Sequence, residues 1–162
     1  MAPMLTARKY ARTAVLDGKL YAVGGMSEAD GATSNLVERY DFATKAWEEV
    51  ALMATPHETH AVAVLDGKLY AVGGKNDDDG HLSSVEQYDP ATNAWEAVAP
   101  MAEARLYHAV AVLDGKLYAV GGFNNGFLSS VERYDAAENV WEAVAPMATA
   151  RLSPGVQGVA LL

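Results

Sequence analysis

Three arginines of this sequence share a local context from which they could hold an anion. Arg8, Arg105 and Arg151 each directly follow an alanine. Guanidinium groups bind carboxylates and phosphates through paired hydrogen bonds, so copies of this arginine around one channel would form an anion clamp. The same groups can instead cap the backbone carbonyls of loops, and the sequence leaves both roles open.

Histidines form a second group of candidate ligands. His60 and His108 both precede the sequence Ala-Val-Ala-Val-Leu, and His57 lies three residues before His60. Imidazole is a common metal ligand, so three such rings near one axis would suggest a metal site. No carboxylate or further histidine recurs at a fixed spacing from them, so we expect neither a metal ion nor another cofactor.

Aromatic residues complete the candidate binding surface. Tyr10, Tyr107, Phe123 and Phe127 lie in variable segments, with Asn124 beside them. Aromatic rings commonly anchor a protein partner, although such rings also cover the base of a loop. The candidate ligand-binding residues are therefore Arg8, Tyr10, His57, His60, Arg105, Tyr107, His108, Phe123, Asn124 and Arg151.

An acidic stretch resembles a calcium-binding loop only in part. Residues 76–80 read Asn-Asp-Asp-Asp-Gly, but the first ligand position is Lys75, and the last, Glu86, falls in an expected strand. A calcium loop needs an oxygen ligand at its first position. We therefore expect a solvated acidic loop.

Long repeats position all of these residues. Residues 60–74 and 108–122 are identical, and residues 82–102 return at 128–148 with four changes in 21 positions. A more divergent copy covers residues 13–50, and the Leu-Asp-Gly-Lys-Leu-Tyr blocks are spaced by 49 and 48 residues. Periods near 50 are typical of propeller repeats.

Each repeat has the pattern of four antiparallel strands. His-Ala-Val-Ala-Val-Leu and Lys-Leu-Tyr-Ala-Val flank an Asp-Gly pair, the strongest short signal for a two-residue hairpin. Val-Glu-Arg-Tyr-Asp and Trp-Glu-Ala-Val-Ala supply the third and fourth strands. Four antiparallel strands make one propeller blade. We therefore predict an all-β fold with three blades, at about 8–53, 57–101 and 105–147, in a single domain.

The order of Gly-Gly, Tyr-Asp and Trp in each repeat resembles the kelch repeat family. The residues are Gly24, Gly25, Tyr40 and Trp47, then Gly73, Gly74, Tyr88 and Trp95, then Gly121, Gly122, Tyr134 and Trp141. The resemblance implies a kelch-type β-propeller whose loop face holds protein or peptide partners. The copper-oxidase branch of that family depends on a cysteine, which this chain lacks. Glycine permits close backbone approach and aromatic rings bury large areas, so we expect these residues to be structural.

Three blades are too few to close a propeller. Propellers typically carry about 4 to 8 blades. An isolated arc of three leaves an apolar face bare at each end, which soluble monomers rarely tolerate. Two chains supply six blades, the number that the kelch resemblance also favours. We therefore predict a two-fold symmetric homodimer that completes a six-bladed ring.

The sequence after the third repeat resembles another first strand. Residues 155–162 end in a pattern similar to His-Ala-Val-Ala-Val-Leu. This matches the strand-exchange closure of the kelch family, in which one terminus completes a blade begun by the other. The segment 10–16 has the same pattern, and both cannot fill one position. We expect the C-terminal strand to cross into the partner chain, and the N-terminus to be held more loosely.

The charge balance argues against nucleic acid and membranes as partners. The chain has 12 lysines and arginines against 21 aspartates and glutamates, and its net charge of -9 opposes binding to phosphate backbones and anionic lipids. No apolar run approaches the roughly 20 residues that span a bilayer. No secretory signal is visible at the N-terminus, so we expect a cytoplasmic protein.

These observations favour a non-enzymatic binding or scaffold module that assembles with itself. The motifs of serine hydrolases, P-loop proteins, dinucleotide-binding proteins and zinc peptidases are all absent from the sequence. The alternative is a carbohydrate-binding or carbohydrate-modifying enzyme of the kelch type with its site at the ring centre. Near-identical repeats without cysteine also fit an engineered or recently duplicated half-propeller.

Overall fold

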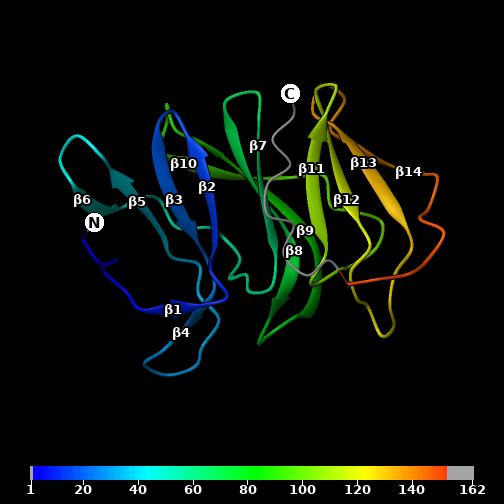
Figure 1. Cartoon of the computed structure of the whole chain (residues 1–162), viewed down its shortest axis with the longest axis horizontal. Helices are drawn as coiled ribbons and strands as arrows, with labels where there is room; N and C mark the ends of the chain where they lie inside the picture. Colours follow the sequence, from blue (N-terminus) through cyan, green and yellow to red (C-terminus); the bar gives the residue numbers. More distant parts are fainter. Residues whose placement is uncertain (1, 153–162) are drawn as a thin grey trace.

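The chain folds into antiparallel sheets. The computed structural model describes residues 2–152, which contain fourteen strands and no helix. Three sheets have four strands each, and a small sheet pairs β1 (Arg8–Lys9) with β4 (Met26–Ser27). The predicted all-β class and the three four-stranded blades are confirmed (Figure 1). Within residues 2–152 there is no helix of the length and hydropathy that crossing a membrane requires.

The strands of each blade follow one another in sequence order. Blade 1 contains β2 (Arg12–Leu16), β3 (Lys19–Val23), β5 (Val37–Asp41) and β6 (Ala46–Glu49). Blade 2 contains β7 (Ala61–Leu65), β8 (Lys68–Asn76), β9 (Gly80–Asp89) and β10 (Ala94–Val98). Blade 3 contains β11 (Ala109–Leu113), β12 (Lys116–Val120), β13 (Val131–Asp135) and β14 (Val140–Val144). The first strand of each blade contacts that of the next, β2 with β7 and β7 with β11.

An Asp-Gly pair turns the chain between the first two strands of every blade. In blade 2, Asp66 and Gly67 have φ angles of 51° and 71°, and the strands pair from Leu65 opposite Lys68 outward. Positive φ at both central residues matches the twist of the flanking strands. Because aspartate tolerates this conformation and glycine adopts it freely, the dipeptide sets the register of the hairpin.

Apolar side chains fill the two spaces between blades. Between blades 1 and 2, Leu16 and Tyr21 meet Leu69 and Tyr88, and the rings of the two tyrosines lie 5.8 Å apart. Each of these four side chains is almost completely buried. The equivalent residues between blades 2 and 3 are Leu65, Tyr70, Leu117 and Tyr134. The hydrophobic core of the chain therefore lies between the sheets.

The glycine pair, which lies within β8 in blade 2, lets backbone segments approach from two sides. A Cβ atom on Gly73 would lie 2.7 Å from the carbonyl oxygen of Arg105, in the segment that leads to blade 3. A Cβ on Gly74 would lie 2.4 Å from the carbonyl oxygen of Glu58, in the segment that leads to blade 2. Both glycines have positive φ, 58° and 94°. A side chain at either position would collide with backbone.

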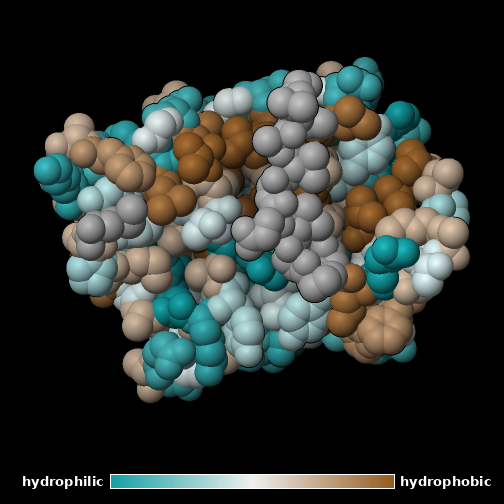
Figure 2. All heavy atoms as spheres, viewed as in Figure 1, coloured by the Kyte–Doolittle hydropathy of each residue, from teal (hydrophilic) through white to brown (hydrophobic). Residues whose placement is uncertain are grey.

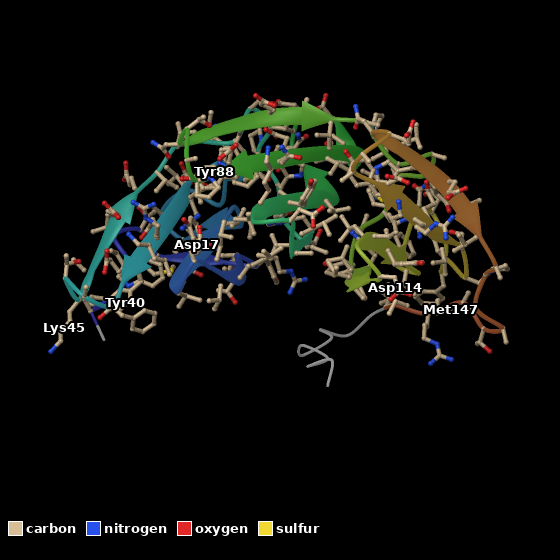
Figure 3. The ribbon with its side chains drawn as sticks, turned by 90° about the horizontal axis from the view of Figure 1, so that it is seen from above. Asp17, Tyr40, Lys45, Tyr88, Asp114 and Met147 are labelled. Atoms are coloured by element: carbon tan, nitrogen blue, oxygen red, sulfur yellow. The ribbon has the colours of Figure 1, made fainter. Side chains whose placement is uncertain are left out.

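The three blades form an open arc (Figure 3). Tyr40 and Lys45 of blade 1 lie at one end, and Met147, which follows blade 3, lies toward the other. Leu113 of blade 3 is 47% exposed, whereas the equivalent leucines of blades 1 and 2 are each 3% exposed because a neighbouring blade covers them. Figure 2 shows apolar residues on the left and on the right of the one face that it displays.

The N-terminal strand is firmly placed, so the expectation of a loose N-terminus is wrong. Strand β2 pairs with β3 at five positions, from Arg12 opposite Val23 to Leu16 opposite Lys19. It holds the first-strand position of blade 1 because its backbone completes the ladder and Leu16 completes the core. The C-terminal strand expected at 155–162 lies outside the described residues.

Candidate functional site

The variable loops lie along one edge of the three blades, opposite the Asp-Gly hairpins, and we call this edge the loop end (Figure 1). They follow the glycine pair in each blade and comprise residues 26–33, 75–81 and 123–127. The segments that link one blade to the next pair with the starts of these loops, as Glu58 pairs with Lys75 and Leu106 with Phe123. Loops on a rigid scaffold commonly carry binding residues, and most of the predicted site residues lie here or just beneath.

Arg105 is a buried structural cation beneath this end. Its guanidinium donates hydrogen bonds to the carbonyl oxygens of Gly121 at 2.9 Å and Ser130 at 3.1 Å. It also binds Glu132 Oε1 at 2.8 Å, and its side chain is inaccessible to solvent. These are the contacts of the carbonyl-capping role, one of the two roles that the sequence left open.

Arg8 makes the same contacts in blade 1. Its guanidinium donates to the carbonyl oxygens of Gly24 at 2.8 Å and Leu36 at 2.6 Å, and to Glu38 Oε1 at 3.1 Å. The side chains of Arg8 and Glu38 are both inaccessible to solvent. Burial lowers the pKa of Arg8, although the Glu38 carboxylate acts in the opposite direction. The pair is therefore a buried ion pair that holds the N-terminal segment against blade 1.

His57 takes the position of the arginine in blade 2. Its Nδ1 lies 2.7 Å from the carbonyl oxygen of Gly73, and its Nε2 lies 3.3 Å from Glu86 Oε1. Burial alone would raise the pKa of Glu86, but hydrogen bonds from His57 and from the backbone N–H groups of Ala54 and Thr55 lower it. A charged or polar side chain thus ties each blade to the segment that precedes it.

Three buried glutamates, which the sequence reasoning missed, receive these side chains. Each accepts hydrogen bonds from two consecutive backbone N–H groups of the preceding segment, and they are Glu38, Glu86 and Glu132. A signal was present in the sequence, because each glutamate lies two residues before a tyrosine of the same strand. Residues two apart in a strand share a face, so a glutamate two positions from a core tyrosine is expected to be buried.

His60 and His108 are buried without polar partners. Within residues 2–152, neither ring nitrogen of either histidine has a hydrogen-bond partner. The rings fit over the glycines of the preceding blade, with Cε1 of His60 3.0 Å from where a Cβ on Gly24 would lie. Burial, with nearby positive charge, lowers the pKa of His60 well below its ordinary value and that of His108 to about 3. The described residues contain no group of three side chains that would hold a metal ion.

These two histidines are expected to make the protein less stable in mild acid. The unfolded chain binds protons at histidine below about pH 6.5, while the folded chain keeps both rings neutral, so stability present at pH 7 is lost as the pH falls from about 6.5 toward 3. The loss is on the order of 1 kcal/mol per pH unit for each histidine. Urea unfolding at pH 7, 6 and 5 measures it, above the range in which most carboxylates titrate.

Two variants separate this effect from general acid sensitivity. His60→Leu combined with His108→Leu is expected to flatten the dependence between pH 7 and 5, because no buried imidazole then remains at either position. His81→Gln, in the loop of blade 2, serves as the matched control and keeps the slope of the parent protein. A double variant with the parental slope would contradict the assignment.

The predicted site residues divide into a buried group and an exposed group. Arg8, His57, His60, Arg105 and His108 lie beneath the surface and hold blades and connecting segments together. The remaining residues reach the surface at the loop end, and they are Tyr10, Tyr107, Phe123, Asn124 and Arg151. Only the second group is accessible to a ligand in the described structure.

Tyr10 and Tyr107 occupy equivalent positions with an unusual backbone. Their φ angles are 59° and 52°, and their side chains are 52% and 39% exposed. Thr59 holds the same position in blade 2 with a φ of 52°, which is strained for a β-branched residue. Such strain is often found at functional sites. Two aromatic rings are thereby presented at the loop end.

A second aromatic group lies at the tip of blade 3. Phe123 packs edge-on against both Phe127 and His81, with ring centroids 6.0 and 6.1 Å away. His81 Nδ1 lies 3.0 Å from the side-chain oxygen of Asn124. Phe127 is 61% exposed. This group joins the loops of blades 2 and 3 and offers an apolar contact to a partner.

The acidic loop of blade 2 is organised by its own side chains. The side-chain oxygen of Asn76 accepts hydrogen bonds from the backbone N–H groups of Asp78 and Asp79. Asp77 accepts one from Thr33 of blade 1 at 3.0 Å. The Asn76 side chain therefore shapes the turn, and the Asp77 carboxylate links the two loops.

Comparisons with known proteins find a matching family model, a related sequence and a similar solved structure. Residues 3–160 match the family model described as the KLHDC2/KLHL20/DRC7 Kelch-repeats domain. A stretch of 52 residues is 48% identical to an F-box/kelch-repeat protein of Arabidopsis thaliana and covers 31% of this chain and 11% of that protein. The fold is similar to the solved structure of YjhT, with a TM-score of 0.73 at 21% identity over 88% of this chain and 53% of YjhT. The chain thus spans about half of YjhT and about a tenth of the Arabidopsis protein.

Proposed function

The chain belongs to the kelch-repeat family, and from this we propose that it is a non-enzymatic binding or scaffold module whose ring is completed by a second copy of itself. Six blades then surround one axis, and every exposed residue of the loop end occurs twice around it. The loop end binds a protein or peptide partner through the aromatic residues of both copies.

The unfinished contact at the ends of the arc carries this proposal. Blade 3 presents Leu113, Tyr118 and Val120 on a face that no other blade covers within residues 2–152, in the positions that Leu65, Tyr70 and Val72 use to pack against blade 3. Leu113 is 47% exposed, whereas Leu65 is 3% exposed. Blade 1 of a second copy offers the complementary leucine and tyrosine. Two such contacts close a ring, and the match to about half of YjhT fits that count.

The exposed aromatic residues support a partner at the loop end. Tyr10, Tyr107 and Phe127 are 52%, 39% and 61% exposed at the loop end. Aromatic side chains dominate the energetics of protein interfaces because they bury large areas at a small entropic cost. A peptide lying across the ring would meet these side chains from both copies.

Native mass and one charge substitution test the ring. The parent protein is expected to have the mass of two chains at micromolar concentration. Leu113→Asp places an unpaired carboxylate in the contact, which costs several kcal/mol, so the dimer should weaken on the order of 100-fold. Phe127→Asp, which changes another exposed apolar residue but on the loop end, should leave the mass unchanged. A folded parent protein with the mass of one chain would overturn the proposal, and a sugar retained at the ring centre would favour the carbohydrate alternative.

A further inference from the structure

The segment that links one blade to the next is seven residues long and occurs in four versions, although residues 2–152 contain three blades. We call these segments connectors. They comprise residues 2–8, 51–57, 99–105 and 145–151. The first reads Ala-Pro-Met-Leu-Thr-Ala-Arg and the last Ala-Pro-Met-Ala-Thr-Ala-Arg, so these two differ only at Leu5 and Ala148.

An internal connector packs against the blade that precedes it. In the connector 99–105, Met101 is 3% exposed and its Cε lies 3.0 Å from where a Cβ on Gly73 would be. The carbonyl oxygen of Arg105 accepts a hydrogen bond of 2.8 Å from the backbone N–H of Gly74. The connector thus closes over the glycine pair of blade 2.

The same connector also forms hydrogen bonds with the blade that follows. Its arginine, Arg105, binds Glu132 of blade 3 at 2.8 Å. The carbonyl oxygen of Ala99 accepts a hydrogen bond of 2.9 Å from the indole N–H of Trp141. One connector with two engaged sides therefore lies at each internal boundary between blades.

Within residues 2–152, the N-terminal connector contacts the blade that follows it, blade 1, but no preceding blade. The indole N–H of Trp47 donates to the carbonyl oxygen of Ala2 at 2.9 Å, and the backbone N–H of Leu5 donates to Glu38 at 2.7 Å. Arg8 binds the same glutamate. Its methionine, Met4, is only partly buried, and within residues 2–152 no blade covers the other side of this connector.

Within residues 2–152, the C-terminal connector contacts the blade that precedes it, blade 3, but no following blade. The carbonyl oxygen of Arg151 accepts a hydrogen bond of 3.0 Å from Gly122, and its N–H donates to the carbonyl oxygen of Leu128 at 3.1 Å. The N–H of Met147 donates to the carbonyl oxygen of Ser129 at 2.8 Å. The Arg151 side chain is exposed, because no glutamate from a following blade meets it within residues 2–152.

We propose that these two half-engaged connectors compete for one position where blade 3 of one protomer meets blade 1 of its partner, and that Arg151 can replace Arg8 on the partner's Glu38. This inference rests on the proposed two-chain ring. In that ring both connectors would lie over the same glycines, the same tryptophan and the same glutamate. Each internal boundary holds one connector, so the equivalent boundary between two chains has room for only one of these two.

The competition is close to balanced because the two segments are nearly the same peptide. Six of their seven residues are identical, including the alanine, methionine and arginine that make the contacts. Leu5, the one difference, is 58% exposed and so contributes little to holding its own connector in place. Either copy can therefore seal the boundary while the other is released, and neither is indispensable.

Arginine substitutions in the full chain test this redundancy. Arg8→Met alone and Arg151→Met alone should each leave a dimer, since the other arginine reaches Glu38. The double variant should dissociate at least tenfold more readily than the two single effects combined would give. Arg105→Met is the matched control because no second arginine can reach Glu132, so its unfolding midpoint should stay well below that of the parent protein at every protein concentration. In Arg8→Met the difference from the parent protein should shrink as the protein concentration rises, since the partner's Arg151 then reaches Glu38.

Hydrogen exchange gives a second readout, which can first be measured in the parent protein. In the parent dimer, the backbone N–H groups of Ala148 and Thr149 should become protected when the C-terminal connector takes the partner's Glu38. In Arg8→Met their protection should increase and that of Leu5 and Thr6 should fall. If the effects of Arg8→Met and Arg151→Met on a stable dimer simply added, or if this protection did not change, the competition between connectors would be overturned. The proposed two-chain ring would still stand. A parent protein that stays a single chain would overturn both.

Discussion

Arg105→Met is expected to lower the free energy of unfolding by about 3–5 kcal/mol, because it removes one partner of a buried ion pair. Glu132 would keep its two backbone hydrogen bonds but lose the cation that neutralises it 2.8 Å away. The carbonyl groups of Gly121 and Ser130 would also lose a donor. Methionine keeps most of the apolar stem, so the loss reports the charge and its hydrogen bonds rather than a cavity.

Chemical denaturation of the Arg105→Met variant measures this loss. Arg133→Met is the matched control, because Arg133 pairs with Glu142 on the exposed face of the same blade and exposed pairs contribute little. Its unfolding midpoint should not change. If Arg105→Met were as stable as the parent protein, Arg105 would be free for a ligand, and the anion-clamp role would regain support.

Gly73→Ala is expected to lower the free energy of unfolding by roughly 3 kcal/mol, combining left-handed backbone strain with a collision. The φ of Gly73 is 58°, and the new Cβ would lie 2.7 Å from the carbonyl oxygen of Arg105 and 3.0 Å from the ring of His108. A backbone oxygen cannot rotate away as a flexible side chain would. The segment leading to blade 3 would have to move outward and weaken the Arg105 and Glu132 contact.

Gly67→Ala separates the strain from the collision. Gly67 has a similar φ of 71°, but nothing lies within 4 Å of where its Cβ would be. This control should lose only the strain, about 1 kcal/mol. Thermal or urea unfolding of both variants compares them directly. Equal losses would mean that the close approach over the glycine pair does not matter.

The proposed boundary between two chains differs chemically from the internal ones. Asn93 and Asn139 each accept a hydrogen bond from the backbone N–H of the preceding connector, at Ala51 and Ala99. Lys45 occupies the equivalent position of blade 1, also with a positive φ, and an ammonium group cannot accept such a bond. The boundary between chains is therefore expected to be weaker than the boundaries within one, which suits a connector that can exchange.

Burial explains why the candidate site was only partly predictable. Arginine and histidine beside variable loops suggested ligand contacts, yet Arg8, His57 and Arg105 are turned inward by Glu38, Glu86 and Glu132. A one-dimensional pattern does not show which residue from another strand will face a given side chain. Exposed aromatic residues such as Tyr10 and Tyr107 were easier to place, because they lie in segments without a core pattern.

The sequence by itself determined the blades, because its signals are local. Alternating apolar residues and Asp-Gly pairs set the strands, the hairpins and their register through backbone geometry within a few residues. The near identity of residues 2–8 and 145–151 was also readable there. Only the tertiary structure decided which polar residues are buried and which half of each terminal connector is engaged. Those outcomes depend on contacts between blades, where residues roughly 30 apart in the chain desolvate and neutralise one another.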